Sequence, residues 1–308
     1  AGNPASEIDL IKSLTQSIAH SDFDKKTWPG IFREHARGDL GSSALLGHRE
    51  GQDWSTRFEI VEIHNTAEKL SFIARDESAL LQIEGSFEFD QFGILRIDYQ
   101  LLNEGDRYNL ESLVYWLPLP HRAKERMDFT GRWAAERQVQ RAGIDTGLWV
   151  RQSREGRSGH DFTIAQLAME RSTNFSHGEV WSVALAWSGN SSHMIEKSYT
   201  GSTSIGASEV LYPGEVILER GERYQAPTLV ANFSNEGLDG LAANHHRSLR
   251  ARKHHPSRPR PLTLNMWEAI YFDHSHERVA AIVDAAARIG VERVVLDDGW
   301  FGSRRDDR

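Results

Sequence analysis

Two adjacent carboxylates follow an apolar run near one end of the sequence. In "VVLDDGW", residues 294–300, Asp297 and Asp298 come directly after a stretch typical of a strand, and "NMWEA", residues 265–269, ends a second such stretch. Because ligands of parallel α/β folds sit at the carboxyl ends of strands, Trp267 is expected beside the two aspartates. An aromatic ring can pack on the C–H face of a pyranose while carboxylates accept its hydroxyl donors. The residue types therefore suit a sugar site, although an isolated Asp-Asp-Gly is also a common turn, and the residues alone leave both interpretations open.

A helix between the two apolar runs would bring their ends together. The spacing predicts a helix beginning at Ser275 and closed by Gly290, with one apolar face formed by Val279, Ile282, Val283, Ala286 and Ile289. Strand, helix and strand in this order predict a βαβ unit with parallel strands.

The preceding part of the chain has a different period. Apolar residues alternate with polar ones over residues 81–89 and 95–101 on either side of "DQFG", which predicts a hairpin with one buried face. Further runs of period two follow at 113–117, 181–187 and 216–218, separated by turn signals. These features predict a mainly β protein with an antiparallel sandwich over about residues 40–235. A short amphipathic helix is expected over residues 7–19.

A helical pattern and a basic, proline-containing segment separate the two regions. Leu238, Leu241, Ala242, His245 and Leu249 suit a helix, which "RKHHPSRPRP", residues 252–261, cannot continue. We therefore expect a β domain with a terminal linking helix over residues 1–255 and an α/β region over residues 256–308.

Composition excludes several classes of function. The 308 residues carry a formal net charge of −8, which disfavours a nucleic acid as partner, and no apolar run approaches the length of a membrane span. The absence of cysteine excludes disulfides and favours a cytoplasmic protein. No metal is expected, because the pairs His245–His246 and His254–His255 fall in a basic, solvated stretch and the acidic pairs lack EF-hand spacing.

Two other segments rich in Arg, Trp and His could reach a site. "FTGRWAAERQVQR", residues 129–141, and "GRSGHD", residues 156–161, lack an alternating pattern and are interpreted as inter-strand connections. "AWSGN", residues 186–190, lacks the glycine before the serine of a nucleophile elbow, which argues against a serine hydrolase.

Several motifs, in order, resemble the α-galactosidases of glycoside hydrolase family 36. They are "FTGRWAAERQ", "GRSGHD", "GEVWSVALAWSGN", "LYPGEV" and "NMWEAIYFD" followed by "VLDDGWFGSRRDD". The resemblance implies an N-terminal β-supersandwich followed by the first βαβ unit of a (β/α)8 barrel. It also implies that Trp267 walls a galactose subsite, that Asp297 and Asp298 hold the O4 and O6 hydroxyls, and that no cofactor is needed. Finally, it implies α-galactoside oligosaccharides of the melibiose or raffinose type as substrates and a homo-oligomer in which "GQDWS", with Asp53 and Trp54, reaches a neighbouring active site.

The family's catalytic pair has no counterpart in the sequence. The resemblance implies a retaining mechanism, which needs two carboxyls about 5 Å apart on either side of the glycosidic bond. The motifs that carry the nucleophile and the acid/base are absent, and residues 256–308 are far shorter than a barrel of about 250 residues. We therefore expect a C-terminally truncated chain that is inactive alone. An α-N-acetylgalactosaminidase, a galactosyltransferase of the same family and a noncatalytic sugar-binding or assembly module remain alternatives.

Overall fold

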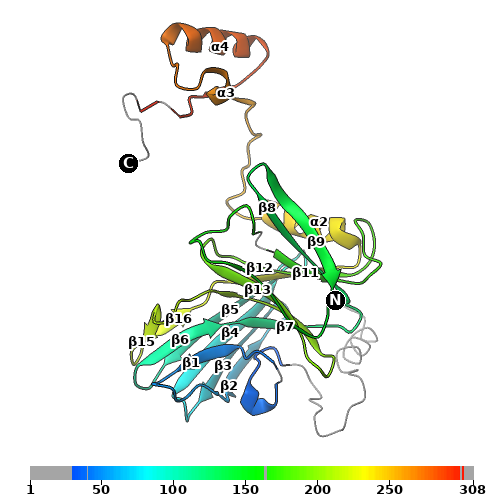
Figure 1. Ribbon diagram of the computed structural model, residues 1–308, viewed down its shortest axis with the longest axis vertical. Coiled ribbons are helices and arrows are strands. Elements are labelled where there is room, and N and C mark those ends of the chain that lie inside the picture. Colours follow the sequence, from blue (N-terminus) through cyan, green and yellow to red (C-terminus); the bar gives the residue numbers. More distant parts are fainter. Residues whose placement is uncertain (1–29, 40, 163–164, 299, 302–308) are drawn as a thin grey trace. The chain divides into compact units, whose positions relative to one another are not determined.

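The chain folds into two units, which a computed structural model describes for residues 30–39, 41–162, 165–298 and 300–301. The helix predicted over residues 7–19 lies outside these ranges. One unit comprises residues 1–251 and the other residues 252–308 (Figure 1). The domain boundary expected after residue 255 stays a prediction.

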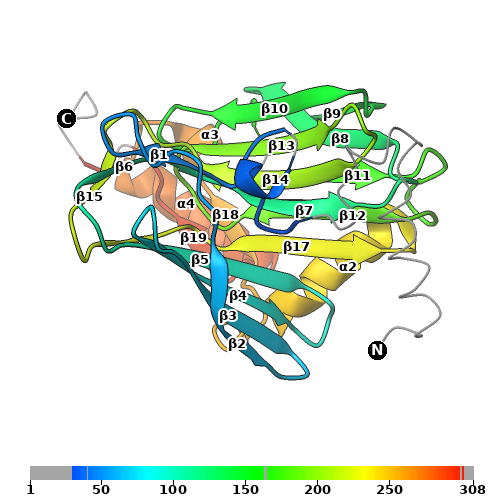
Figure 2. The same cartoon turned by 90° about the horizontal axis from the view of Figure 1, so that it is seen from below.

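The described residues of the first unit form three antiparallel sheets (Figure 2). The largest contains, in spatial order, β2 (Glu59–Asn65), β3 (Lys69–Asp76), β4 (Leu81–Phe89), β5 (Leu95–Asn103), β17 (Leu229–Ser234), β12 (Val180–Leu185), β11 (Ala165–Met169), β8 (Glu125–Arg132) and β9 (Ala135–Gly143), with β16 (Arg223–Gln225) on another part of β5. The second contains β10 (Gly147–Ser153), β13 (Ser191–Lys197), β14 (Thr203–Glu209) and β7 (Tyr115–Leu119). The third contains β1 (Leu45–His48), β6 (Tyr108–Leu113) and β15 (Val216–Leu218), and a 3-10 turn, η2 (His35–Arg37), precedes β1.

The mainly β, sandwich-like fold predicted from the sequence is confirmed. β12 of the ten-stranded sheet packs against β14 of the four-stranded sheet, so the two sheets enclose a common core. The hairpin predicted over residues 81–101 is β4 and β5, paired from Leu81–Asn103 to Phe89–Leu95. Its inward residues include Leu81, Ile83, Ile97, Tyr99 and Leu101, all at most 1% exposed. Period two along these strands thus identified the face that drives the packing.

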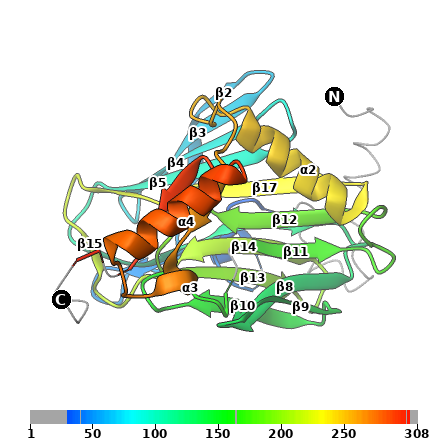
Figure 3. The ribbon, with the colours of Figure 1, turned by 90° about the horizontal axis from the view of Figure 1, so that it is seen from above.

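The helix α2 (Gly237–Arg250) covers part of the ten-stranded sheet on the side opposite the sandwich core (Figure 3). Leu241 is 7% exposed and joins Met127, Leu167, Met169 and Val180 in a second apolar cluster. The Asn232 side chain donates to the Leu241 carbonyl at 2.9 Å. This helix is the one predicted from the apolar spacing. His245 and His246 belong to it, so their assignment to a solvated linker was wrong.

The second unit contains the predicted βαβ arrangement. β18 (Thr263–Asn265) and β19 (Arg293–Val295) pair in parallel, with α3 (Trp267–Ile270) and α4 (His276–Arg288) between them. Ser275 is the N-cap of α4, and Gly290 follows its C-cap with φ +84°, a left-handed conformation that glycine adopts without steric cost. The second unit therefore has the arrangement expected for the start of a barrel: two parallel strands, β18 and β19, joined through α3 and α4.

One local prediction for the second unit was wrong. The strand expected over "LTLNMWEA" ends at Asn265, and Trp267 begins a helical turn. A short apolar run is compatible with either structure, and here the Asn265 side chain accepts the Trp267 N–H, which favours a turn over a continued strand. The helix with the predicted apolar face is α4, and this face is only partly covered: Ala286 is buried, while Val283 is 39% and Ile289 78% exposed. Two strands of three residues offer too little surface to cover it.

Candidate functional site

The carboxyl ends of β18 and β19 lie side by side. Leu264 pairs with Val294 and Asn265 with Val295, and the Met266 N–H donates to the Val295 carbonyl at 3.2 Å. Chain segments leaving the two strands therefore diverge from the same edge of the sheet. Trp267 and Asp297 each follow the last residue of their strand by one intervening residue.

Asn265 connects the two predicted groups. Its Oδ1 accepts the Trp267 N–H at 2.8 Å, forming a turn that caps α3, and its Nδ2 donates to Asp297 Oδ2. The other Asp297 oxygen, Oδ1, accepts the Asp298 N–H at 2.9 Å. Both carboxylate oxygens of Asp297 are thus held in place. The Asp298 side chain is exposed and makes no hydrogen bond or ion pair with the described residues.

Three aromatic rings cluster at the same strand end. Trp267 contacts Tyr271 with ring centroids 5.3 Å apart and Phe272 with centroids 5.1 Å apart, both edge to face. Tyr271 is 53% and Phe272 66% exposed. A hydrogen bond from the Tyr271 hydroxyl to Glu268, together with the charge of that carboxylate, raises the pKa of Tyr271. The arrangement offers an accessible apolar surface next to fixed oxygen acceptors.

Asn265, Tyr271 and Phe272 were not predicted as site residues from the sequence. "IYF" and a single asparagine after a strand have no distinctive pattern. Only the polar residue at the carboxyl end of "LTLN" could have been noticed.

Asp53 and Trp54, the other predicted site residues, lie in the first unit on a loop after β1. Arg49 and Gln52 exchange two backbone hydrogen bonds across Glu50 and Gly51. These two residues have φ +50° and +85°, which is a two-residue turn with a positive φ at both positions. The turn is followed by Asp53, also at positive φ, and by Trp54, which is 61% exposed.

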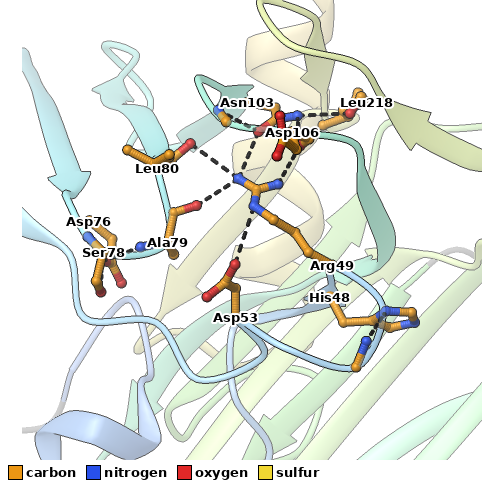
Figure 4. A network of polar contacts seen from close by, with 12 residues as sticks. His48, Arg49, Asp53, Asp76, Ser78, Ala79, Leu80, Asn103, Asp106 and Leu218 are labelled. Atoms are coloured by element: carbon orange, nitrogen blue, oxygen red, sulfur yellow. Dashed lines mark hydrogen bonds and ion pairs between the residues drawn. The ribbon is translucent and has the colours of Figure 1, made fainter.

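Arg49 fixes this loop to the sandwich (Figure 4). Its guanidinium donates to the carbonyls of Ala79 and Asp106, both at 2.6 Å, and to Asn103 Oδ1 at 2.8 Å. Its Nε lies 3.3 Å from Asp53 Oδ2. Asp53 is therefore a partner of Arg49, whereas Trp54 leaves most of its side chain accessible to a ligand or another protein.

Asp76 stabilises the turn next to this network through hydrogen bonds. Its Oδ1 accepts Ser78 Oγ, the Ser78 N–H and the Ala79 N–H at 2.6–3.0 Å, and its Oδ2 accepts the Arg57 N–H at 2.7 Å. Burial alone would raise the pKa of Asp76, but these hydrogen bonds outweigh it and lower the pKa. The carboxylate thereby holds the turn that presents the Ala79 carbonyl to Arg49.

Asp76→Asn is expected to lower the free energy of unfolding by about 2 kcal/mol at pH 7, because an amide is a weaker acceptor than a charged carboxylate. Because folding lowers the pKa of Asp76, its charged carboxylate stabilises the folded protein at pH values above the ordinary pKa of aspartate. This stability is lost as the pH falls through the lowered pKa of Asp76. Urea denaturation at pH 7 and near pH 3 should show a smaller difference between wild type and variant at the lower pH. Asp106→Asn should have little effect on the free energy of unfolding. The Asp106 side chain is exposed, and only the backbone carbonyl of this residue bonds to Arg49. An equal loss of stability at both pH values would contradict the assignment.

One of the two segments rich in Arg, Trp and His folds differently from the prediction. Residues 129–141 belong to the β8–β9 hairpin rather than to a connection, and Trp133 at its turn is 76% exposed. Residues 156–161 are a loop, as expected, and His160 contacts the Trp133 ring edge to face at 5.7 Å.

Within the described ranges, no three His, Asp or Glu side chains are grouped as metal ligands would be. No described helix is long and apolar enough to cross a membrane.

Comparison with family models places two consecutive matches on the chain. Residues 5–219 match the glycosyl hydrolase family 36 N-terminal domain, and residues 223–308 match melibiase. The segment with Trp267, Asp297 and Asp298 lies in the second match.

Similar curated proteins are bacterial and fungal α-galactosidases. An α-galactosidase of Escherichia coli is 35% identical over 304 residues, covering 97% of this chain and 43% of its own length. α-Galactosidase AgaA of Geobacillus stearothermophilus is 31% identical over 256 residues, covering 80% of this chain and 35% of its own. The chain thus spans less than half the length of these relatives.

Solved structures share the fold. The crystal structure of AgaA superimposes with a TM-score of 0.81 at 25% identity, over 90% of this chain and 42% of AgaA. A variant of AgaA in complex with raffinose gives a TM-score of 0.82 at 24% identity, over 96% of this chain and 46% of the other.

Proposed function

Since the chain belongs to glycosyl hydrolase family 36, we propose that the whole protein is a retaining α-galactosidase acting on terminal α-D-galactosyl residues of oligosaccharides. The strand-end arrangement supports this most directly, because one asparagine side chain links the carboxylate of Asp297 to the backbone of Trp267. We propose melibiose- or raffinose-type substrates, in line with the raffinose complex of the AgaA variant.

Trp267, Asp297 and Asp298 bind galactose in this proposal and do not cleave the bond. The indole packs on the apolar face of the sugar, and the two carboxylates accept the O4 and O6 hydroxyls. Because O4 is axial in galactose and equatorial in glucose, acceptors fixed at this position distinguish the two sugars. Asn265 keeps Asp297 in the required orientation.

Asp297 and Asp298 do not form a catalytic pair. A retaining glycosidase needs a nucleophile and an acid/base on opposite sides of the bond, with carboxyls about 5 Å apart. Adjacent residues at one strand end approach the sugar from one side. We therefore propose that residues 1–308 supply the substrate-binding carboxylates and that both catalytic carboxyls lie elsewhere in the whole protein.

Asp53 and Trp54 are proposed to contribute to the active site of a neighbouring subunit in a homo-oligomer. The support is the loop itself: Arg49 holds Asp53, and Trp54 is 61% exposed. We further propose a cytoplasmic location, for which the absence of cysteine is the support.

Assays with nitrophenyl glycosides test the proposal. The whole protein should release nitrophenol from the α-galactoside much faster than from the N-acetyl-α-galactosaminide, and residues 1–308 alone should release none from either. A whole protein active only on the N-acetylated substrate would contradict the choice of sugar. Turnover by purified residues 1–308 would contradict the assignment of the catalytic carboxyls.

A further inference from the structure

The sandwich unit contains a hollow of about 530 Å³ between the ends of several strands. Its lining combines an indole, two carboxylates and a side-chain amide, contributed by Trp187 after β12, Asp98 on β5, Glu209 at the end of β14 and Gln225 at the end of β16. The connection from β16 to β17, residues 226–228, completes the lining. None of these residues belongs to the strand-end site of the second unit.

Each carboxylate in this hollow is oriented by one hydroxyl group. Thr228 Oγ1 donates to Asp98 Oδ1, and the Tyr224 hydroxyl donates to Glu209 Oε2, both at 2.5 Å. The second oxygen of each carboxylate accepts no hydrogen bond from the described residues. Burial raises the pKa of Glu209, the Tyr224 hydrogen bond opposes this, and the charge of Glu215 adds to it. The hollow thus presents two fixed oxygen acceptors.

The Trp187 indole lies close against the backbone of Gly189. A Cβ atom at Gly189 would lie 2.4 Å from Trp187 Nε1, so only glycine leaves room for the ring in this position. The Trp187 side chain nevertheless remains 42% exposed. An accessible aromatic ring provides an apolar binding surface.

A second hollow of about 350 Å³ shares Asp98 and Gln225 with the first. It continues over the outward side chains of the strands, including Ser86 on β4 and Gln100 on β5. The Gln100 amide donates to Gln225 Oε1 at 3.0 Å, which links the two hollows. We call the two hollows, which share these lining residues, the Trp187 groove.

We propose that the Trp187 groove binds a neutral oligosaccharide at a site distinct from the strand-end site. An indole beside carboxylate and amide groups suits a chain of pyranoses, whose rings have apolar faces and whose hydroxyls donate hydrogen bonds. Beside Trp187, Asp98 and Glu209 would repel phosphate or sulfate groups. A cation is disfavoured, since the described residues contain no group of three side chains placed as metal ligands.

Calorimetric titration of residues 1–308 with raffinose tests the proposal. The titration uses a chain carrying Asp297→Asn and Asp298→Asn, so that binding at the strand-end site is suppressed. Raffinose should still bind, and Trp187→Ala in this background should weaken binding by about tenfold or more, because the apolar surface is lost. Gly189→Ala should have a similar effect because its Cβ displaces the ring without removing it.

Trp133→Ala is the matched control, because it removes another exposed indole from the β8–β9 hairpin and should not change the affinity. Glu209→Gln, which keeps the size of the side chain, should weaken binding while leaving the circular dichroism spectrum unchanged. Failure of raffinose to bind, or the same affinity after Trp187→Ala, would overturn the proposal. Either result would leave the α-galactosidase proposal intact, because nitrophenyl galactoside hydrolysis by the whole protein measures that function separately.

Discussion

Changing Asp298 to Asn in the whole protein should lower kcat/KM for a nitrophenyl α-galactoside by about 10- to 100-fold. A hydrogen bond to a charged group contributes about 1.5–3 kcal/mol, and about 1.4 kcal/mol corresponds to a factor of ten. Asp297→Asn should cost at least as much, because Asp297 also accepts the Asn265 amide and the Asp298 N–H. The double variant should lose about 10²- to 10⁴-fold if the two effects add.

The residual activity distinguishes binding from bond cleavage. A carboxylate that only holds the sugar leaves measurable turnover, whereas loss of a nucleophile would leave essentially none. Asp273→Asn is the matched control. This exposed carboxylate precedes α4 and pairs with Arg278, and its replacement should change kcat/KM by less than about twofold. If Asp298→Asn abolished turnover completely, or left kcat/KM unchanged, the assigned role would be wrong.

Arg49→Met should lower the free energy of unfolding by about 3 kcal/mol. The side chain is 13% exposed and bonds to the Ala79 and Asp106 carbonyls and to Asn103 Oδ1 (Figure 4). Ala79 is 3% and Asn103 0% exposed, so water cannot readily replace the lost donors. The guanidinium also lies 5.1 Å from the centroid of the Tyr108 ring.

Urea denaturation at pH 7 measures this effect. Arg49→Lys should recover only part of the stability, because an ammonium group cannot reproduce the planar arrangement of guanidinium donors. The control is Arg57→Met, since the Arg57 side chain is 65% exposed and, among the described residues, makes only a surface ion pair with Glu59. A loss below about 0.5 kcal/mol for Arg49→Met would show that the network does not stabilise the loop.

The strongly periodic parts of the fold were predictable from the sequence. The β4–β5 hairpin alternates buried and outward residues over its whole length, and α4 has both a serine N-cap and a glycine after its C-cap. The β8–β9 hairpin was missed because every residue of β9 after Ala135 is exposed. A strand without a buried face carries no hydrophobic alternation for a sequence pattern to detect.

The site was predictable only in part. The rule that ligands lie at strand ends brought Trp267 and Asp297 to one edge, and the structure places them there. Asn265 and Arg49 were missed because their importance depends on partners distant in sequence. Asn265 reaches a carboxylate 32 residues away, and Arg49 reaches Asn103, 54 residues away. Single polar residues of this kind have no local signature.

The central claim is that Trp267, Asp297 and Asp298 hold galactose at the shared end of two parallel strands. A crystal structure of the whole protein with bound galactose tests it most directly. We expect the apolar face of the sugar to lie against the Trp267 indole, with its O4 and O6 hydroxyls within hydrogen-bonding distance of Asp297 and Asp298. Galactose bound in the active site without contact to either carboxylate would contradict the claim.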